Sequence, residues 1–199
     1  MMRQHSPDIR IITALPAEAK PINHHFSLQR DNRITAFPLF RNEELMLVVS
    51  GVGQQAAAAA TQWLHGHSPP RHNSLWINIG IAGHATRELG QAILADRVCN
   101  DQGADISIAT PAVPAFARAT VVTVAQPTAD YPDDRIYDME AFGFISVASR
   151  LLPPGAGQCL KIISDNRDNP MRSISAKLVS GLISDKIDTL VELIEHWDI

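Results

Sequence analysis

The sequence predicts an α/β protein in which helices cover both faces of a mostly parallel or mixed sheet. Short apolar runs of strand length alternate along the chain with segments of helical periodicity, and this alternation is typical of α/β folds. Hydrophobic residues make up 45% of the 199-residue chain, which is enough to bury a sizeable core. We therefore expect one domain over residues 1–199.

The first half of the chain begins with the run Asp8 to Leu15, which becomes continuously apolar, as a buried strand does. Pro16 then suits the first position of a helix, and the alanine-rich run Gln54 to Leu64 has high helix propensity. The polar run His65 to Asn73 predicts a surface loop. The remaining predicted elements here are strands at Ile34 to Phe40, Leu45 to Ser50 and Leu75 to Gly80, and glycine turns at Gly51-Val52-Gly53 and Gly80-Ile81-Ala82-Gly83.

The second half contains more short apolar runs, a loop from Pro127 to Arg135 and a final stretch, about Ser173 to Trp197, with apolar residues at helical spacing. We expect that last stretch to be one helix. The predicted strands are Gln91 to Val98, Asp105 to Ala109, Thr120 to Ala125 and Cys159 to Ser164.

The stretch Ile136 to Ala148 predicts a helix with apolar residues on more than one face, and such a helix is normally buried. Glu140 falls in its first turn. A carboxylate is favoured at a helix N-terminus by the aligned peptide dipoles, but it is disfavoured in apolar surroundings unless something there needs it. Glu140 is therefore the strongest single indication of function in the sequence.

Composition excludes several classes of partner. The formal net charge of −4 provides no basic surface, so we expect no nucleic acid. No apolar run reaches the roughly 20 residues that span a bilayer, and the polar N-terminal residues lack the apolar core of a signal peptide. Cys99 and Cys159 have no metal-ligand spacing and fit a reduced compartment. These features predict a cytoplasmic protein with no membrane partner.

Three carboxylates follow predicted strands or open predicted helices: Glu18, Glu140 and Asp165. In an open α/β sheet, ligands bind beyond the carboxyl ends of the strands, so these acids and the two glycine turns could meet at one crevice. Each acid also has a simpler explanation. Glu18 and Glu140 could offset helix dipoles, Glu140 with Asp138 as the N-cap, and Asp165 could be an ordinary turn residue.

Cofactor and metal chemistry find little support. The run Gly51 to Ala56 fits the dinucleotide fingerprint, but no acid lies between Leu45 and Arg87 to bind the ribose, so we exclude a nicotinamide cofactor. The histidine pairs His24-His25 and His65-x-His67 lack a third ligand in a regular pattern. We expect no cofactor and no metal.

Five segments, taken in order, resemble the nucleoside phosphorylase and nucleosidase superfamily, and most closely the 5′-methylthioadenosine/S-adenosylhomocysteine nucleosidases. The resemblance implies a three-layer αβα sandwich with a central mixed sheet. It also implies a homodimer or higher homo-oligomer. The segments are Ile11 to Glu18, Val48 to Gly53, Ile77 to Gly83, Asp138 to Ala141 and Ile162 to Asp165.

The resemblance implies a role for each acid in cleaving the N-glycosidic bond of an adenosine-derived nucleoside. Glu18 matches the base that activates water, Glu140 matches the residue that binds the ribose hydroxyls, and Asp165 matches the acid that protonates the leaving purine at N7. The implied substrate-binding residues are Glu140, Met139, Ser164, Gly53, Ala82 and Gly83.

Two alternatives to a hydrolase stay open: a purine nucleoside phosphorylase, and a non-catalytic module that binds a nucleoside. The segment Leu15 to Lys20 lacks the arginine of the family's phosphorylases, and a carboxylate there would repel phosphate, which favours water. The chain departs from the family in the shortened region 97–137 and in His84, which stands where a glycine is common. Only Tyr131 and Phe116 are candidates for an aromatic residue that stacks on the base.

Overall fold

The computed structural model describes residues 8–70, 73–111, 116–170 and 174–197. Residues 1–7, part of the predicted loop His65 to Asn73, and Ser173 lie outside these ranges. Within them, no helix has the length and hydrophobicity needed to cross a membrane.

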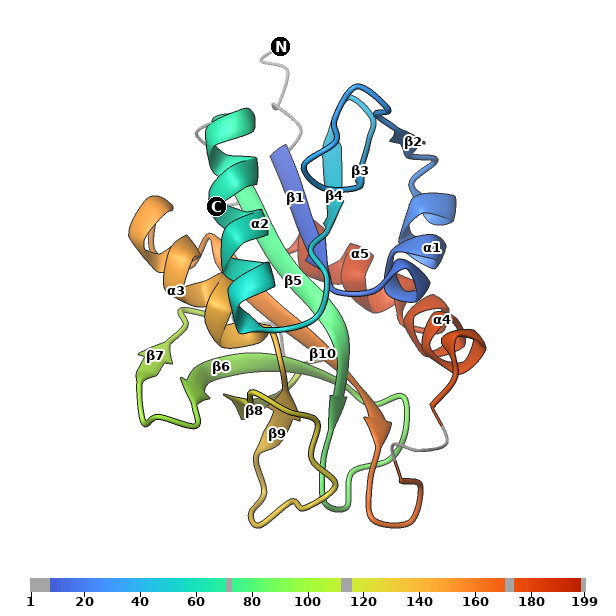
Figure 1. Cartoon of the computed structure of the whole chain (residues 1–199), viewed down its shortest axis with the longest axis vertical. Helices are drawn as coiled ribbons and strands as arrows, with labels where there is room; N and C mark the ends of the chain where they lie inside the picture. The colour runs from blue at the N-terminus through green and yellow to red at the C-terminus, as the bar shows by residue number, and fades with distance from the viewer. Residues whose placement is uncertain (1–7, 71–72, 112–115, 171–173, 198–199) are drawn as a thin grey trace.

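A ten-stranded mixed sheet forms the centre of the molecule (Figure 1). Strand β1 pairs in parallel with both β4 and β5, and β5 pairs in parallel with β10, so these four strands end at the same edge. The antiparallel strands β3 and β2 extend the sheet beyond β4. The strands are β1 (Asp8–Thr13), β2 (Gln29–Arg30), β3 (Leu39–Arg41), β4 (Leu45–Val49), β5 (Ser74–Gly83), β6 (Ala92–Asn100), β7 (Asp105–Ser107), β8 (Ala117–Thr123), β9 (Ile136–Asp138) and β10 (Gly157–Asp165).

The other end of the sheet closes on itself. Strand β10 pairs with β6, β6 with β8, β8 with β9, and β9 returns to β5 through the pair Gly83 and Tyr137. Together with the pairing of β5 and β10, these contacts form a ring of five strands. Strand β5 is therefore shared between the open sheet and the ring, and its carboxyl end lies where the two meet.

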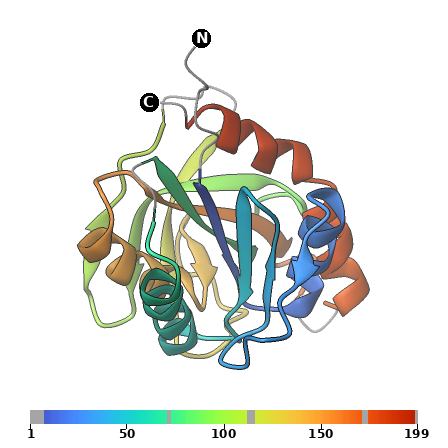
Figure 2. The ribbon, with the colours of Figure 1, turned by 90° about the horizontal axis from the view of Figure 1, so that it is seen from above.

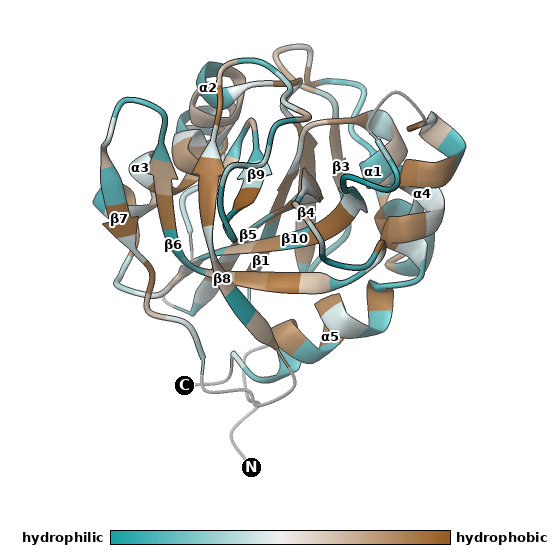
Figure 3. Ribbon diagram, turned by 90° about the horizontal axis from the view of Figure 1, so that it is seen from below, coloured by the Kyte–Doolittle hydropathy of each residue, from teal (hydrophilic) through white to brown (hydrophobic). Residues whose placement is uncertain are grey.

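The helices form two layers, with α2 and α3 on one side of the sheet and α1, α4 and α5 on the other (Figures 1 and 2). Their apolar faces pack onto the strands, which are largely brown in the hydropathy view, whereas many of the connecting loops are teal (Figure 3). The helices are α1 (Pro16–His25), α2 (Gln54–His67), α3 (Ala141–Leu151), α4 (Ala176–Ser184) and α5 (Ile187–Glu195).

The close packing of α2 on α3 depends on Gly143. A Cβ atom at this position would collide with the main chain of Gln54, the first residue of α2. Because Gly143 has no side chain, the N-termini of the two helices approach each other closely. This approach brings the Gly51–Gly53 turn next to Glu140.

Several predicted elements have different boundaries. The segment Gly80 to Gly83 is not a turn, because β5 continues to Gly83 and pairs there with β10. The predicted strand Ile34 to Phe40 is wrong over most of its length: β3 begins at Leu39, after Pro38, which has no N–H to donate to a ladder. Likewise, α3 begins at Ala141, while Ile136–Asp138 is a strand and Glu140 occupies the N-cap position without making a capping side-chain hydrogen bond.

The predicted terminal helix is two helices. Two polar residues, Asp185 and Lys186, separate α4 from α5. Both helices bury apolar side chains, among them Ile183 and Leu190, which are fully buried. The interruption turns the chain so that the apolar faces of both halves reach the core.

Candidate active site

One cavity of about 190 Å³ opens beside the carboxyl ends of β1, β5 and β10. Glu18, Glu140 and Asp165 all line it, so three acids far apart in the sequence face one space. Among the described residues that line the cavity, none is an arginine or a lysine. The predicted meeting of the three carboxylates is therefore confirmed as geometry, while the role of each stays a prediction.

Glu18 lies in the first turn of α1 and is 2% exposed. Its Oε2 accepts hydrogen bonds from the main-chain N–H groups of Ala14 and Leu15, both at 2.9 Å, and its Oε1 accepts one from Ile81 at 3.0 Å. Burial raises the pKa of Glu18, although these N–H donors and the Lys161 charge oppose the rise. The bonds to Ala14 and Leu15 show that Glu18 also caps its own helix, whereas the bond to Ile81 ties it to β5.

Gly80 gives Glu18 its space. A Cβ atom at Gly80 would lie 2.8 Å from Glu18 Oε1 and 3.3 Å from its Cδ. Real Cβ atoms essentially never approach a heavy atom as closely as the first of these distances. The sequence Ile79-Gly80-Ile81 therefore provides both the room for the carboxylate and one of its hydrogen-bond donors.

Glu140 does not cap its own helix. Asp138 does so instead, since its Oδ2 accepts from the N–H groups of Glu140 at 3.2 Å and Ala141 at 2.7 Å. The Glu140 side chain turns to Gly53, whose N–H donates to Oε1 at 2.7 Å. Gly53 has a φ of 108°, a conformation that favours glycine. Burial, together with the nearby Asp138 charge, raises the pKa of Glu140 to about 7.

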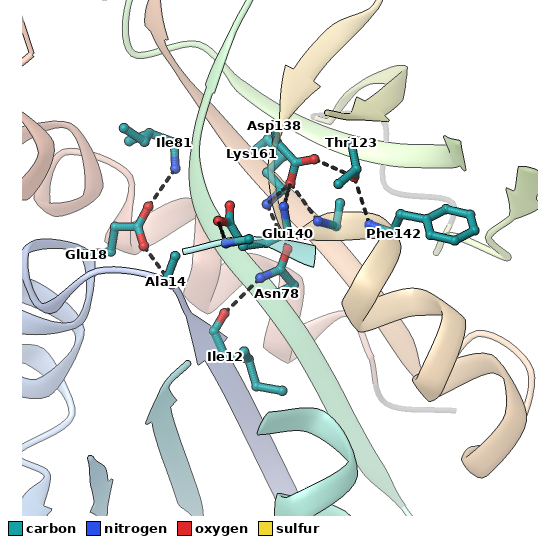
Figure 4. A network of polar contacts seen from close by, with 12 residues as sticks. Ile12, Ala14, Glu18, Asn78, Ile81, Thr123, Asp138, Glu140, Phe142 and Lys161 are labelled. Carbon is teal, nitrogen blue, oxygen red and sulfur yellow. Dashed lines mark hydrogen bonds and ion pairs between the residues drawn. The ribbon is translucent and has the colours of Figure 1, made fainter. Parts of the chain in front are cut away.

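Beneath these acids lies a buried network around Lys161, drawn in Figure 4. The Lys161 ammonium group, on β10, forms an ion pair with Asp138 at 2.8 Å and donates to Asn78 Oδ1 at 2.7 Å. Thr123 Oγ1 donates to Asp138 Oδ1 at 2.6 Å. A charged side chain is rarely buried unless it is paired, so this cation and the Asp138 carboxylate depend on each other.

Lys161, Asn78 and Thr123 were not predicted as parts of the site. A sequence signal for two of them exists: Lys161 interrupts the apolar run Cys159 to Ile163, and Asn78 interrupts the run Leu75 to Ile79. A polar residue inside a buried strand requires a buried partner. That signal indicates that partners exist without identifying them.

Asp165 is the last residue of β10 and is 4% exposed. Ser164 Oγ donates to its Oδ1 at 2.7 Å, and the Tyr131 hydroxyl donates to its Oδ2. Burial, followed by the interaction with Asp165, raises the pKa of Tyr131, so the phenol stays protonated at neutral pH. Both oxygens of the Asp165 carboxylate therefore accept from a hydroxyl, which an ordinary turn residue does not require.

Most of the other predicted site residues also lie at the cavity. Met139, Ser164, Ala82 and Gly83 line it, whereas Gly53 contributes through its N–H to Glu140. Of the two aromatic candidates, Tyr131 lines the cavity and Phe116 packs in the hydrophobic core.

His84 and the other metal-binding residue types form no metal site in the part of the chain that the structure describes. His84 is fully buried, with Nδ1 accepting from the N–H groups of Thr86 and Arg87 and Nε2 lying 3.1 Å from Asp134 Oδ1. Across the described ranges, no three residues among His, Cys, Asp and Glu are grouped to hold a metal ion.

The architecture is the nucleoside phosphorylase-like fold, as predicted. The 5′-methylthioadenosine nucleosidase of Arabidopsis thaliana matches with a TM-score of 0.78 and 17% identity, over 96% of each chain. The 5′-methylthioadenosine/S-adenosylhomocysteine nucleosidase of S. pneumoniae, solved with the transition-state inhibitor MT-ImmA, matches with a TM-score of 0.77 and 17% identity over 96% of this chain and 99% of that one.

A third solved structure, the MTAN of Chlamydia trachomatis, has 22% identity and a TM-score of 0.69 over 92% of this chain and 97% of that one. No protein-family model and no curated protein sequence matches the chain. At these identities the likeness establishes the fold, and the assignment of an activity depends on the cavity.

Proposed function

We propose that the protein is a nucleosidase that hydrolyses the N-glycosidic bond of an adenosine-derived nucleoside. The observation that carries this proposal is the presence of three buried carboxylates, Glu18, Glu140 and Asp165, around one cavity. The similar solved structures support the substrate class, since their names are those of nucleosidases for methylthioadenosine or S-adenosylhomocysteine.

In the proposed reaction the C1′–N9 bond breaks and its electron pair moves onto the purine. In its protonated form Asp165 gives its proton to N7 of the leaving base, and a proton from solvent restores the acid after turnover. The attacking water forms a bond to C1′ and loses its proton to Glu18. A carboxyl group whose pKa is raised by burial is a stronger base when ionised, and general acid or base groups of this kind each contribute about 10²–10⁴ in rate.

The proposed role of Glu140 is to accept hydrogen bonds from the ribose hydroxyls while the sugar acquires positive charge. Its Oε1 is fixed by Gly53, so its other oxygen is the one available to a substrate. An ionised carboxylate near an oxocarbenium-like sugar also stabilises the developing charge. Met139, which precedes Glu140 and lines the cavity, would pack against the sugar.

Water is favoured over phosphate as the nucleophile by the charges around the cavity. A phosphate-binding site needs cationic donors, usually arginine, and the described lining residues include none. Each of the three acids that is ionised would also repel an anion. This argues against a phosphorylase, although both reactions break the same bond.

The test is to incubate the purified protein with methylthioadenosine, S-adenosylhomocysteine and adenosine, each with and without phosphate, and to detect adenine by chromatography. We expect adenine from at least one of them, at the same rate in both conditions. Release that requires phosphate would identify a phosphorylase. If no adenine forms but the nucleosides bind, the protein is a non-catalytic module and the proposal is wrong.

A further inference from the structure

Tyr131 is buried although it comes from a segment without regular structure. Residues 124–135 contain neither helix nor strand, yet the Tyr131 side chain is 2% exposed and lines the cavity. Its ring lies against Gly83 so closely that a Cβ atom there would be 2.8 Å from Cε1. The ring centroid is 5.6 Å from that of Tyr137, and Arg167 donates to the Tyr131 carbonyl oxygen at 2.8 Å.

The Tyr131 hydroxyl is bonded to the Asp165 oxygen with which a leaving base must interact. In the proposed reaction N7 must come within hydrogen-bonding reach of Asp165, about 2.6–3.2 Å. Oδ1 of Asp165 accepts from Ser164, which is the preceding residue of the same buried strand. Oδ2 accepts from Tyr131, whose segment has no ladder to hold it. Of the two partners of Asp165, Tyr131 is therefore the one that a bound base can displace.

The size of the cavity leads to the same conclusion. Its volume is about 190 Å³, below the roughly 300–1,000 Å³ of pockets that bind small molecules. The cavity is therefore smaller than such a pocket while the Tyr131 ring stays in place. Rotation of this flat aromatic ring out of the cavity would free a flat space beside Asp165, which suits a purine.

We propose that Tyr131 fills the base subsite of the unliganded protein, and that the purine displaces its ring and takes its place at Asp165 Oδ2. This inference rests on the proposed function and assigns the residue that governs entry of the base. Substrate binding then includes the loss of one hydrogen bond between a phenol and a carboxylate, so Tyr131 raises KM. Once the tyrosine has left, it has no part in bond cleavage, so kcat does not depend on it.

The test compares binding of adenine to the wild type and to Tyr131→Phe by isothermal titration calorimetry. The phenylalanine keeps the ring but releases Asp165 Oδ2, so we expect at least about tenfold tighter binding, the size of one hydrogen bond to a charged group. Tyr131→Ala also empties the subsite and should bind adenine at least as tightly. Tyr137→Phe is the matched control, because its hydroxyl donates to Asp133 at 2.9 Å and not to Asp165.

Steady-state kinetics with the best substrate provides the second readout. Tyr131→Phe should lower KM by the same factor as the dissociation constant of adenine and leave kcat within about twofold. A purely structural role would instead lower the melting temperature and raise KM. Weaker or unchanged adenine binding in Tyr131→Phe, while the wild type still releases adenine, overturns the displacement alone. Failure of the wild type to bind or release adenine overturns the proposed function as well.

Discussion

The two ends of the cavity are held in different ways. At the end formed by Glu18 and Glu140, each carboxylate accepts from main-chain N–H groups, and a buried ion pair lies beneath them. At the Asp165 end, both carboxylate oxygens accept from side-chain hydroxyls. Main-chain donors move only if the backbone itself moves, whereas a hydroxyl leaves by rotation of one side chain. The first end is therefore built to keep its shape, and the second can adjust to a ligand.

The largest expected effect comes from Asp165→Asn, which removes the proposed proton donor at the adjustable end. Asparagine has nearly the same shape, so the protein should fold and bind adenine, while kcat falls by about 10²–10⁴-fold. Single-turnover adenine release measures this loss. Asp168→Asn, at an exposed acid three residues later, is the matched control and should keep its rate. An unchanged rate in Asp165→Asn would show that the proton comes from elsewhere.

Lys161→Met tests the buried ion pair at the fixed end. Methionine fills a similar volume but leaves the Asp138 carboxylate buried without its cation, and breaking such a pair costs about 3–5 kcal/mol. Urea unfolding should show a loss of this size. Lys177→Met, at an exposed lysine of α4, should change the free energy of unfolding by less than about 0.5 kcal/mol.

The double variant Lys161→Met, Asp138→Asn sharpens this test because it also removes the Asp138 charge that the single variant leaves unpaired. We expect it to recover part of the stability lost in the single variant. If Lys161→Met alone unfolds at the same urea concentration as the wild type, the ion pair does not hold this end of the cavity.

Glu140→Gln should reveal the buried charge through the pH dependence of stability. The pKa of Glu140 is raised from 4.5 to about 7, so the folded protein binds this proton more tightly than the unfolded chain does. The wild type therefore loses stability as the pH rises from about 4.5 to about 7, and glutamine, which can still accept from Gly53, avoids this loss.

The melting temperature of Glu140→Gln relative to the wild type should accordingly increase between about pH 5 and pH 8. Differential scanning fluorimetry across this range measures the difference. Glu88→Gln, at an exposed glutamate, serves as the control and should give a flat difference. A difference that decreases with rising pH would mean that the ionised form of Glu140 is stabilised by folding.

The smallest effect is expected from Gly80→Ala, which crowds Glu18 without removing it. The new Cβ atom would lie 2.8 Å from Oε1, so the carboxylate must shift away from the N–H groups that hold it. Overpacking of this kind costs about 1–3 kcal/mol, and we expect a similar loss in transition-state stabilisation, about 5–150-fold in kcat/KM. Gly66→Ala in α2, where a Cβ meets open space, should be neutral or stabilising.

The sequence predicted the acids at both ends of the cavity, but not the side-chain contacts that hold them. Apolar runs and their order placed β1, β4, β5 and β10, and the rule for strand ends then placed Glu18, Gly53 and Asp165. Lys161 and its partners escaped prediction because a buried polar residue indicates a partner but not which one. The contact between Tyr131 and Asp165 joins residues 34 positions apart. No local sequence pattern predicts the backbone conformation of residues 124–135, which brings them together.

Local patterns also failed where tertiary packing sets an element's length. The continuation of β5 through Gly80 depends on pairing with β10, which lies about 80 residues later in the chain. The end of α4 at Ser184 depends on tertiary packing, because the chain must turn there for the apolar face of α5 to reach the core. In both places the short-range signal, a glycine or a helical period, was overruled by a distant contact. The one-domain organisation, the cytoplasmic location and the homo-oligomer stay predictions.

The closed ring of five strands has a consequence for how this molecule behaves at high concentration. Of the strands within residues 8–70, 73–111, 116–170 and 174–197, only β2 and β7 have a single neighbour, and they are two and three residues long. Unpaired strand edges are where proteins join into aggregates, and very short edges that carry charged residues resist this. Arg30 and Asp105 stand on these edges. The closure that places the end of β5 beside the cavity therefore also protects the protein from pairing with strands of neighbouring molecules.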